Sequence, residues 1–120
     1  MPTEGSMHWE RSAADLTTRF ETTVDEIEGL ERRKMFGEMA GFVGGNLVTG
    51  LHAGRWFVRL PEASRAEALS LDGATVFAPM PGRPMKEYVV LPPAVLGDSA
   101  ALSVWLDRAV AYGRTLAPKR

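Results

Sequence analysis

The chain of 120 residues has the length of one domain, and its 45% hydrophobic and 24% charged residues are ordinary for a globular protein. A formal net charge of −1 excludes a global field that attracts nucleic acid or an anionic membrane. The absence of cysteine excludes disulfides, thiol nucleophiles and cysteine-ligated metals. No signal-peptide core or bilayer-spanning stretch is present, so we expect a cytoplasmic protein without membrane partners.

The first third of the chain predicts an arm followed by a helix. Residues 1–11 mix Pro, Gly, Ser and charge without period, which is typical of a flexible terminus. Ser12 with Asp15 three positions later approximates a capping box and predicts a helix start. Gly29 is the expected stop. Apolar residues between these points recur at helical spacing, at Leu16, Phe20, Val24 and Ile27.

Three strands punctuated by glycine are expected next. They cover residues 34–43, 47–53 and 55–60, and Gly44-Gly45-Asn46 and Gly54 supply the turns between them. Connections this short join antiparallel neighbours, so the segment predicts a meander. Further glycines inside these strands predict a strongly curled sheet, and they are Gly37, Gly41 and Gly50.

The second half predicts a helix at 62–71, strands at 75–79 and 85–91 with a proline-rich stiff loop between them, and a last helix. Asp98 or Ser99 is its expected cap. The order is therefore α-β-β-β-α-β-β-α. We predict an α+β fold of two layers, with a curled five-stranded antiparallel sheet and helices. One domain spans residues 12–117, and residues 118–120 form a tail.

No pattern of catalytic or metal-binding residues stands out. His8 and His52 lie far apart, whereas a metal site needs three or four converging ligands. The glycines of residues 41–45 precede a strand, whereas a phosphate-binding loop precedes a helix. The acidic residues between Glu21 and Glu31 are interpreted as a solvated face. We therefore predict neither enzymatic activity nor a cofactor.

The strand at residues 55–60 carries the main candidate site. Alternation places Arg55, Phe57 and Arg59 on one face and Trp56, Val58 and Leu60 on the other. An aromatic between two arginines suits a protein partner or a homodimer, and it also suits stacking of a nucleic-acid base. Alternatively, Phe57 packs under another part of the chain and the arginines extend outward.

Other residues extend these alternatives. Arg83 and Lys86 enlarge the basic patch if the proline-rich loop folds over the same face. Trp56 or Tyr88 would line a small-ligand pocket inside the curl of the sheet.

Two blocks of sequence resemble a known family. The first runs from Met35-Phe36-Gly37 through Gly41-Phe42-Val43 and Gly44-Gly45-Asn46 to Trp56-Phe57-Val58-Arg59-Leu60. The second comprises Tyr88-Val89-Val90-Leu91-Pro92, Val95-Leu96-Gly97-Asp98, Leu102, Trp105 and Ala109. In order and spacing they resemble the N-terminal domain of the TfoX/Sxy family, over roughly residues 31–117.

This resemblance implies a two-layer fold with a curled antiparallel sheet, like those of secretion chaperones and YjbR-type proteins. It also implies a regulatory role, since TfoX/Sxy proteins act in bacterial competence alongside the cAMP receptor protein. The best-known members carry a second, helical domain that this sequence lacks, so we expect a standalone N-terminal-type domain. The family supplies no catalytic residues. We expect a non-enzymatic regulatory or protein-interaction module; the alternatives are a nucleic-acid-binding accessory of transcription and a small-ligand-binding domain.

Overall fold

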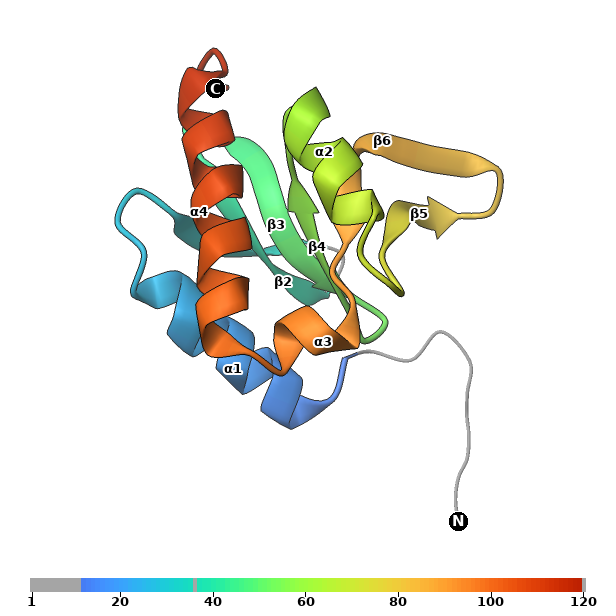
Figure 1. Ribbon diagram of the computed structural model, residues 1–120. Helices are drawn as coiled ribbons and strands as arrows, with labels where there is room; N and C mark the ends of the chain where they lie inside the picture. Colours follow the sequence, from blue (N-terminus) through green and yellow to red (C-terminus); the bar gives the residue numbers. More distant parts are fainter. Residues whose placement is uncertain (1–11, 36, 120) are drawn as a thin grey trace.

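The computed structural model describes residues 12–35 and 37–119, so the predicted arm and His8 lie outside the described residues. Within these residues, six strands form one antiparallel sheet in the order β1-β2-β3-β4-β6-β5, and four helices accompany them (Figure 1). The predicted α+β class and the curled antiparallel sheet are confirmed. The strands are β1 Glu31–Met35, β2 Glu38–Val43, β3 Asn46–His52, β4 Arg55–Arg59, β5 Thr75–Met80 and β6 Arg83–Val90.

The count of six strands corrects the predicted five. The segment 34–43, expected to be one strand, contains the end of β1 and all of β2. Gly37 lies between them with a φ of +81°, a left-handed conformation that glycine adopts without steric cost, so the chain reverses there. The basic triplet at residues 32–34 thus lies on the outer strand β1, where charged side chains discourage pairing with another chain.

A hairpin replaces the predicted stiff loop around the prolines. Strands β5 and β6 continue to a tight turn in which Gly82 has a φ of +76°. Their register shifts on both sides of Phe77, so regular pairing is interrupted where Pro79 falls. Proline is tolerated there because β5 is an edge strand and its outer N–H groups have no partner strand.

Helices cover one face of the sheet and enclose the main core. Helices α1 (Ala14–Asp25) and α4 (Ser99–Thr115) pack on β1 to β4, while α2 (Glu62–Leu69) and the short α3 (Pro93–Leu96) close the far end (Figure 1). Helix α4 lies so close to the sheet that a Cβ at Gly113 would come within 2.7 Å of Val48 Cγ1. This core contains Phe20, Val24, Val48, Trp56, Val58, Leu60, Val89, Leu102, Trp105 and Leu106 among others.

The helix ends agree only in part with the sequence expectations. Asp98 caps α4 as predicted, since its carboxylate accepts from the N–H groups of Ala100 at 3.0 Å and Ala101 at 3.2 Å. The capping box predicted for α1 is wrong, because the cap position is Ala13 and carries no side-chain bond. Ser12 instead accepts from the N–H of Gly54 at 2.9 Å and thus connects the start of α1 to the β3–β4 turn.

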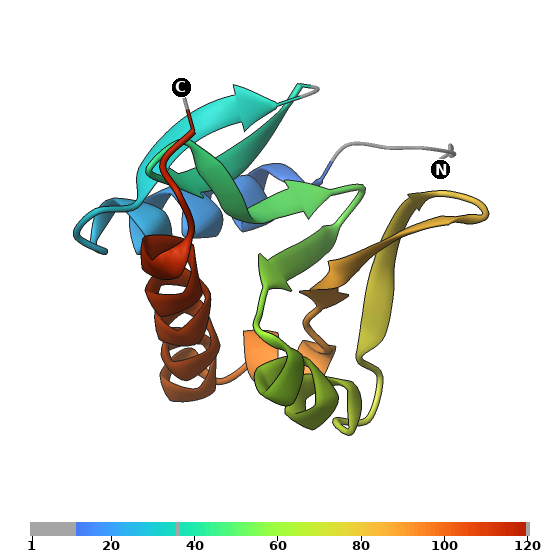
Figure 2. The same ribbon diagram turned by 90° about the horizontal axis from the view of Figure 1, so that it is seen from above.

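The other face of the sheet is covered by the chain itself. Seen from above, the β5–β6 hairpin stands apart from α4 and bends away from the plane of β2 and β3 (Figure 2). A second buried cluster of Phe57, Phe77 and Tyr88 forms on this face, with Met35, Leu47, Met85 and Val90 packed against it. The central strand β4 is therefore buried on both of its faces.

The C-terminal segment returns to the sheet along the β2–β3 turn (Figure 2). The N–H of Lys119 donates to Gly44 O at 2.7 Å, and the amide of Asn46 donates to Ala117 O at 3.0 Å. A side chain at Gly45 would collide with Lys119 O. The glycine turn thus both reverses the chain and leaves room for residues 117–119.

One buried hydroxyl on β3 connects to a side chain and to the main chain of β4. The indole N–H of Trp56 donates to Thr49 Oγ1 at 2.9 Å, and that hydroxyl donates to Phe57 O at 2.8 Å. Thr49 is the one fully buried polar residue among those described. Its hydroxyl satisfies an indole that would otherwise be unpaired in the core.

We therefore expect the Thr49→Val variant to lower the free energy of unfolding by about 1–3 kcal/mol, because it leaves Trp56 Nε1 buried without an acceptor. Urea denaturation followed by tryptophan fluorescence measures the loss. Thr49→Ser keeps the hydroxyl and is the control. Equal stability of Thr49→Val and wild type would contradict the role assigned to this bond.

Candidate functional site

The face expected to carry Arg55, Phe57 and Arg59 is not an open platform. Phe57 is only 1% exposed, and its ring stacks on that of Phe77 with centroids 4.2 Å apart. The hairpin covers it, which is the alternative in which Phe57 packs under another part of the chain. Of the two alternatives left open by the sequence, the interaction face centred on Phe57 is therefore excluded. Arg55 is exposed at the start of β4.

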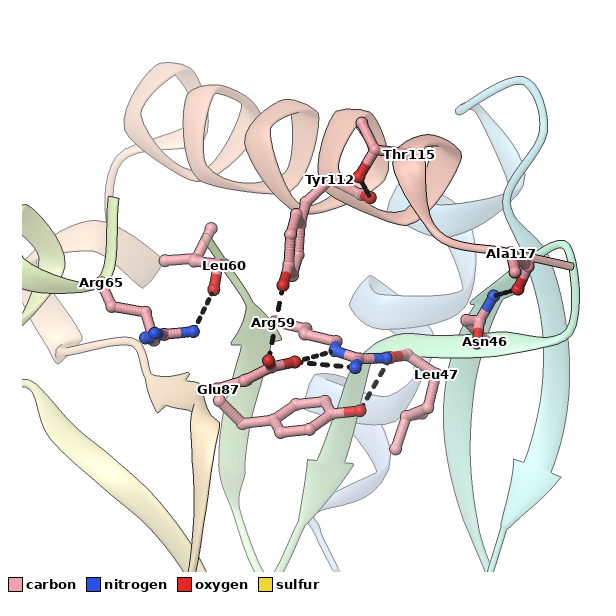
Figure 3. Close-up of polar contacts among 10 residues, drawn as sticks. Asn46, Leu47, Arg59, Leu60, Arg65, Glu87, Tyr112, Thr115 and Ala117 are labelled. Atoms are coloured by element: carbon pink, nitrogen blue, oxygen red, sulfur yellow. Dashed lines mark hydrogen bonds and ion pairs between the residues drawn. The ribbon is translucent and has the colours of Figure 1, made fainter. Parts of the chain in front are cut away.

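Arg59 is occupied by a local polar cluster rather than free for a partner (Figure 3). Its guanidinium binds the Glu87 carboxylate through Nε and Nη2, each at 2.7 Å, and lies near the rings of Tyr88 and Tyr112. Burial alone would lower the pKa of Arg59, but the bond to Glu87 holds it above its ordinary value. Arg59 thus fastens β4 to β6 next to α4.

An apolar cavity of about 140 Å³ lies beneath the hairpin, next to the Phe57 and Phe77 rings. Every one of the six strands contributes to its wall, because the curl of the sheet brings β1 and β2 toward β5 and β6. Its lining consists of Met35, Glu38, Leu47, Leu51, His52, Phe57, Phe77, Pro79 and Met85. This cavity is more enclosed than the open depressions beside α3, between α1 and α4, and between α1 and β2.

Gly50 makes room for one wall of this cavity. A Cβ at this position would come within 2.6 Å of Phe57 Cζ, so the ring occupies the space that a side chain would need. Gly50, which was expected to curl the sheet, thus also allows the Phe57 ring to pack against β3. The ring in turn meets Phe77 from the hairpin, and the three strands β3, β4 and β5 meet there.

Two polar side chains belong to the cavity wall, His52 and Glu38. The His52 ring meets Phe77 edge-on at 5.6 Å between centroids. Each carboxylate oxygen of Glu38 accepts a backbone N–H, from Ser12 at 3.2 Å and from Ala53 at 2.7 Å. Burial raises the pKa of Glu38, but these hydrogen bonds outweigh it, and the pKa lies below the ordinary value.

The remaining residues predicted for the site lie elsewhere. Trp56 is fully buried in the main core and does not line the cavity, so that expectation is wrong. Tyr88 belongs to the second cluster, but its hydroxyl donates to Leu47 O at 3.0 Å, and it is not part of the wall either. Arg83 and Lys86 are exposed on the hairpin.

The sequence analysis expected a pocket inside the curl of the sheet but not this lining, because the wall is assembled from six strands. One signal was present: Trp56-Phe57-Val58 is a continuous apolar run, typical of a strand buried on both faces. The apolar residues Met35, Leu47, Phe77 and Met85 then supply the second cover. Their meeting depends on the hairpin geometry, which spacing alone does not encode.

Glu38 makes a pH-dependent contribution to stability. Its folded-state pKa lies below the ordinary value of 4.5, so the contribution is present above that pH and is lost as pH falls through the lower folded value. We expect Glu38→Gln to be less stable than wild type at neutral pH, and the difference to shrink below about pH 4.5.

Urea denaturation of both proteins at several pH values measures this difference. Glu26→Gln, an exposed position, is the control and should differ little from wild type at any pH. A difference between Glu38→Gln and wild type that stays constant through the acid range would contradict the assignment.

Among residues 12–35 and 37–119, no group of three or more His, Asp or Glu side chains is placed to hold a metal ion. No described helix is long and apolar enough to cross a bilayer.

Comparison with known proteins identifies the family. The model of the TfoX N-terminal domain matches residues 22–112, which run from α1 to near the end of α4. No curated protein and no solved structure matches the chain. The match includes β1 to β6 and therefore all strands that enclose the cavity. The chain belongs to the TfoX N-terminal domain family.

Proposed function

We propose that this TfoX N-terminal domain is a non-enzymatic regulatory module that binds a protein partner, and that the cavity beneath the β5–β6 hairpin is its recognition site. The observation that carries the proposal is the enclosed apolar cavity lined by Phe57, Phe77, Met35 and Met85. Such a space, with few polar groups in its wall, is the usual form of a binding site.

The size of the cavity favours a single side chain over a free ligand. Pockets for drug-sized molecules measure roughly 300–1,000 Å³, whereas this one measures about 140 Å³. An engineered apolar cavity of about 150 Å³ accommodates benzene. One aromatic or branched side chain therefore fills the space, and the rest of its chain lies outside.

The hairpin provides the surroundings that a protein partner would contact. Met80, at the end of β5, is 59% exposed, and Arg83 and Lys86 are exposed on β6. Methionine and arginine are enriched in protein interfaces, where a buried anchor is surrounded by polar contacts. The two cations favour a partner segment with acidic residues beside its anchor.

The other functions considered for this chain have less support. Nucleic-acid binding was expected to use Phe57 as a stacking platform, and that ring is buried. The remaining basis for it is the exposed Arg55, Arg83 and Lys86. Self-association is a special case of the proposal in which the anchor comes from a second copy.

We expect N-acetyl-phenylalanine amide to shift the backbone signals of the cavity residues in ¹H–¹⁵N correlation spectra, and N-acetyl-alanine amide to leave them unchanged. The aromatic ring fills the cavity, whereas the alanine methyl group gains little contact there. A short acidic peptide with one central phenylalanine should bind more tightly than its lysine-flanked counterpart.

Met85→Trp, which fills the cavity from β6, should abolish these shifts. Val104→Trp is the matched control, because Val104 is exposed on α4 away from the cavity. Shifts that are absent, or that survive in Met85→Trp, would contradict the proposal. Sedimentation velocity over a range of concentrations distinguishes self-association, which requires a concentration-dependent dimer.

A further inference from the structure

His52 has a buried ring nitrogen without a hydrogen-bond partner. It is Nδ1, and among the described residues it is the one buried side-chain nitrogen or oxygen in this condition. Leaving a buried polar atom unpaired is unfavourable, and native proteins rarely do so without a reason. His52 also belongs to the wall of the hairpin cavity, so a group entering the cavity can approach this side chain.

The neighbours of His52 do not fill that role. The Glu38 carboxylate accepts from the N–H groups of Ser12 and Ala53 but makes no hydrogen bond with His52 Nδ1. Phe77 presents its ring to the imidazole and has no conventional hydrogen-bonding group in its side chain. The other members of the wall are apolar: Met35, Leu47, Leu51, Phe57, Pro79 and Met85.

A hydroxyl group is the best chemical match for this nitrogen. In a neutral imidazole Nδ1 is either a donor or an acceptor, and a hydroxyl serves in both cases because it donates and accepts. An anionic group is disfavoured, because the Glu38 carboxylate stands in the same wall and a second negative charge would be repelled.

The rest of the wall favours an aromatic ring as the carrier of that hydroxyl. Phe57 and Phe77 offer ring faces and edges, which aromatic groups pack against in offset or edge-on arrangements. Met35 and Met85 add thioether contacts, which are favourable at ring edges. The volume of about 140 Å³ is close to that of a cavity that accommodates one benzene ring.

We propose that the cavity is a tyrosine-binding site: a tyrosine side chain of the protein partner enters beneath the hairpin, and its phenol hydroxyl hydrogen-bonds to His52 Nδ1. This rests on the proposed function and specifies the anchor that it requires. Phenylalanine enters the same space but leaves His52 unpaired, so it binds less well.

Phenol and benzene, which differ by one hydroxyl, test the proposal on the intact domain. NMR titration gives the dissociation constant of each probe for wild type and for His52→Phe, which keeps a ring against Phe77. We expect the preference for phenol over benzene to be about threefold to tenfold larger in wild type than in the variant. The same comparison follows with N-acetyl-tyrosine amide and N-acetyl-phenylalanine amide.

The ¹⁵N shift of the His52 imidazole provides a second measurement that needs no variant. Phenol should move the Nδ1 resonance of wild type, whereas benzene should leave it nearly unchanged. Phenyl phosphate should bind more weakly than phenol, and tighter binding would overturn the choice of a neutral group.

If benzene binds but the hydroxyl preference is the same in both proteins, or Nδ1 does not respond to phenol, the tyrosine assignment fails and the apolar cavity site stands. If neither probe binds, the cavity is not a recognition site and both proposals fail.

Discussion

Burial of β4 on both faces is the constraint on which the rest of the fold depends. Trp56 and Val58 face the helices, and Phe57 faces the hairpin, and all three are at most 1% exposed. The helices cover one face only, so the second face needs another cover. The β5–β6 hairpin supplies it by curling over Phe57, and because this cover fills the space incompletely, a cavity remains. The candidate site is thus a by-product of how the sheet buries its middle strand.

Much of the architecture follows from local sequence signals. Helical spacing from Leu16 onward, the Asp98 cap and the glycine turns at residues 44–46 and 54 indicate their elements correctly. Two errors share a cause. At Gly37 and around the prolines of the hairpin, the sequence contains residues that interrupt strands. It does not indicate whether the chain makes a tight turn or a long loop there. The partner strands decide that, since β1 pairs with β2 and β5 with β6 across turns that leave little room.

The site was less predictable than the fold. Alternation assigned Phe57 to the face opposite Trp56 correctly, but alternation does not reveal whether a face is covered. The cover comes from Phe77, a residue 20 positions later in the chain, and its stacking distance depends on the irregular register of the hairpin. In the sequence, His52 was considered only as a metal ligand, and it was too far from His8 for that role. Its significance appears only when the cavity is seen, because the unpaired nitrogen lies in a wall assembled from all six strands.

Because all six strands share the cavity wall, a ligand bound there would stabilise the whole sheet and not one loop. A ligand that contacts a single loop slows hydrogen exchange in that loop alone. A ligand that contacts all six strands dissociates when any of these strands separates from the sheet. Its binding free energy therefore adds to the cooperative opening of the whole sheet. In hydrogen–deuterium exchange, the amides of the two edge strands β1 and β5 would slow together. Binding in the cavity beneath the hairpin would thus slow amide exchange across the whole sheet, including β1 at the opposite edge.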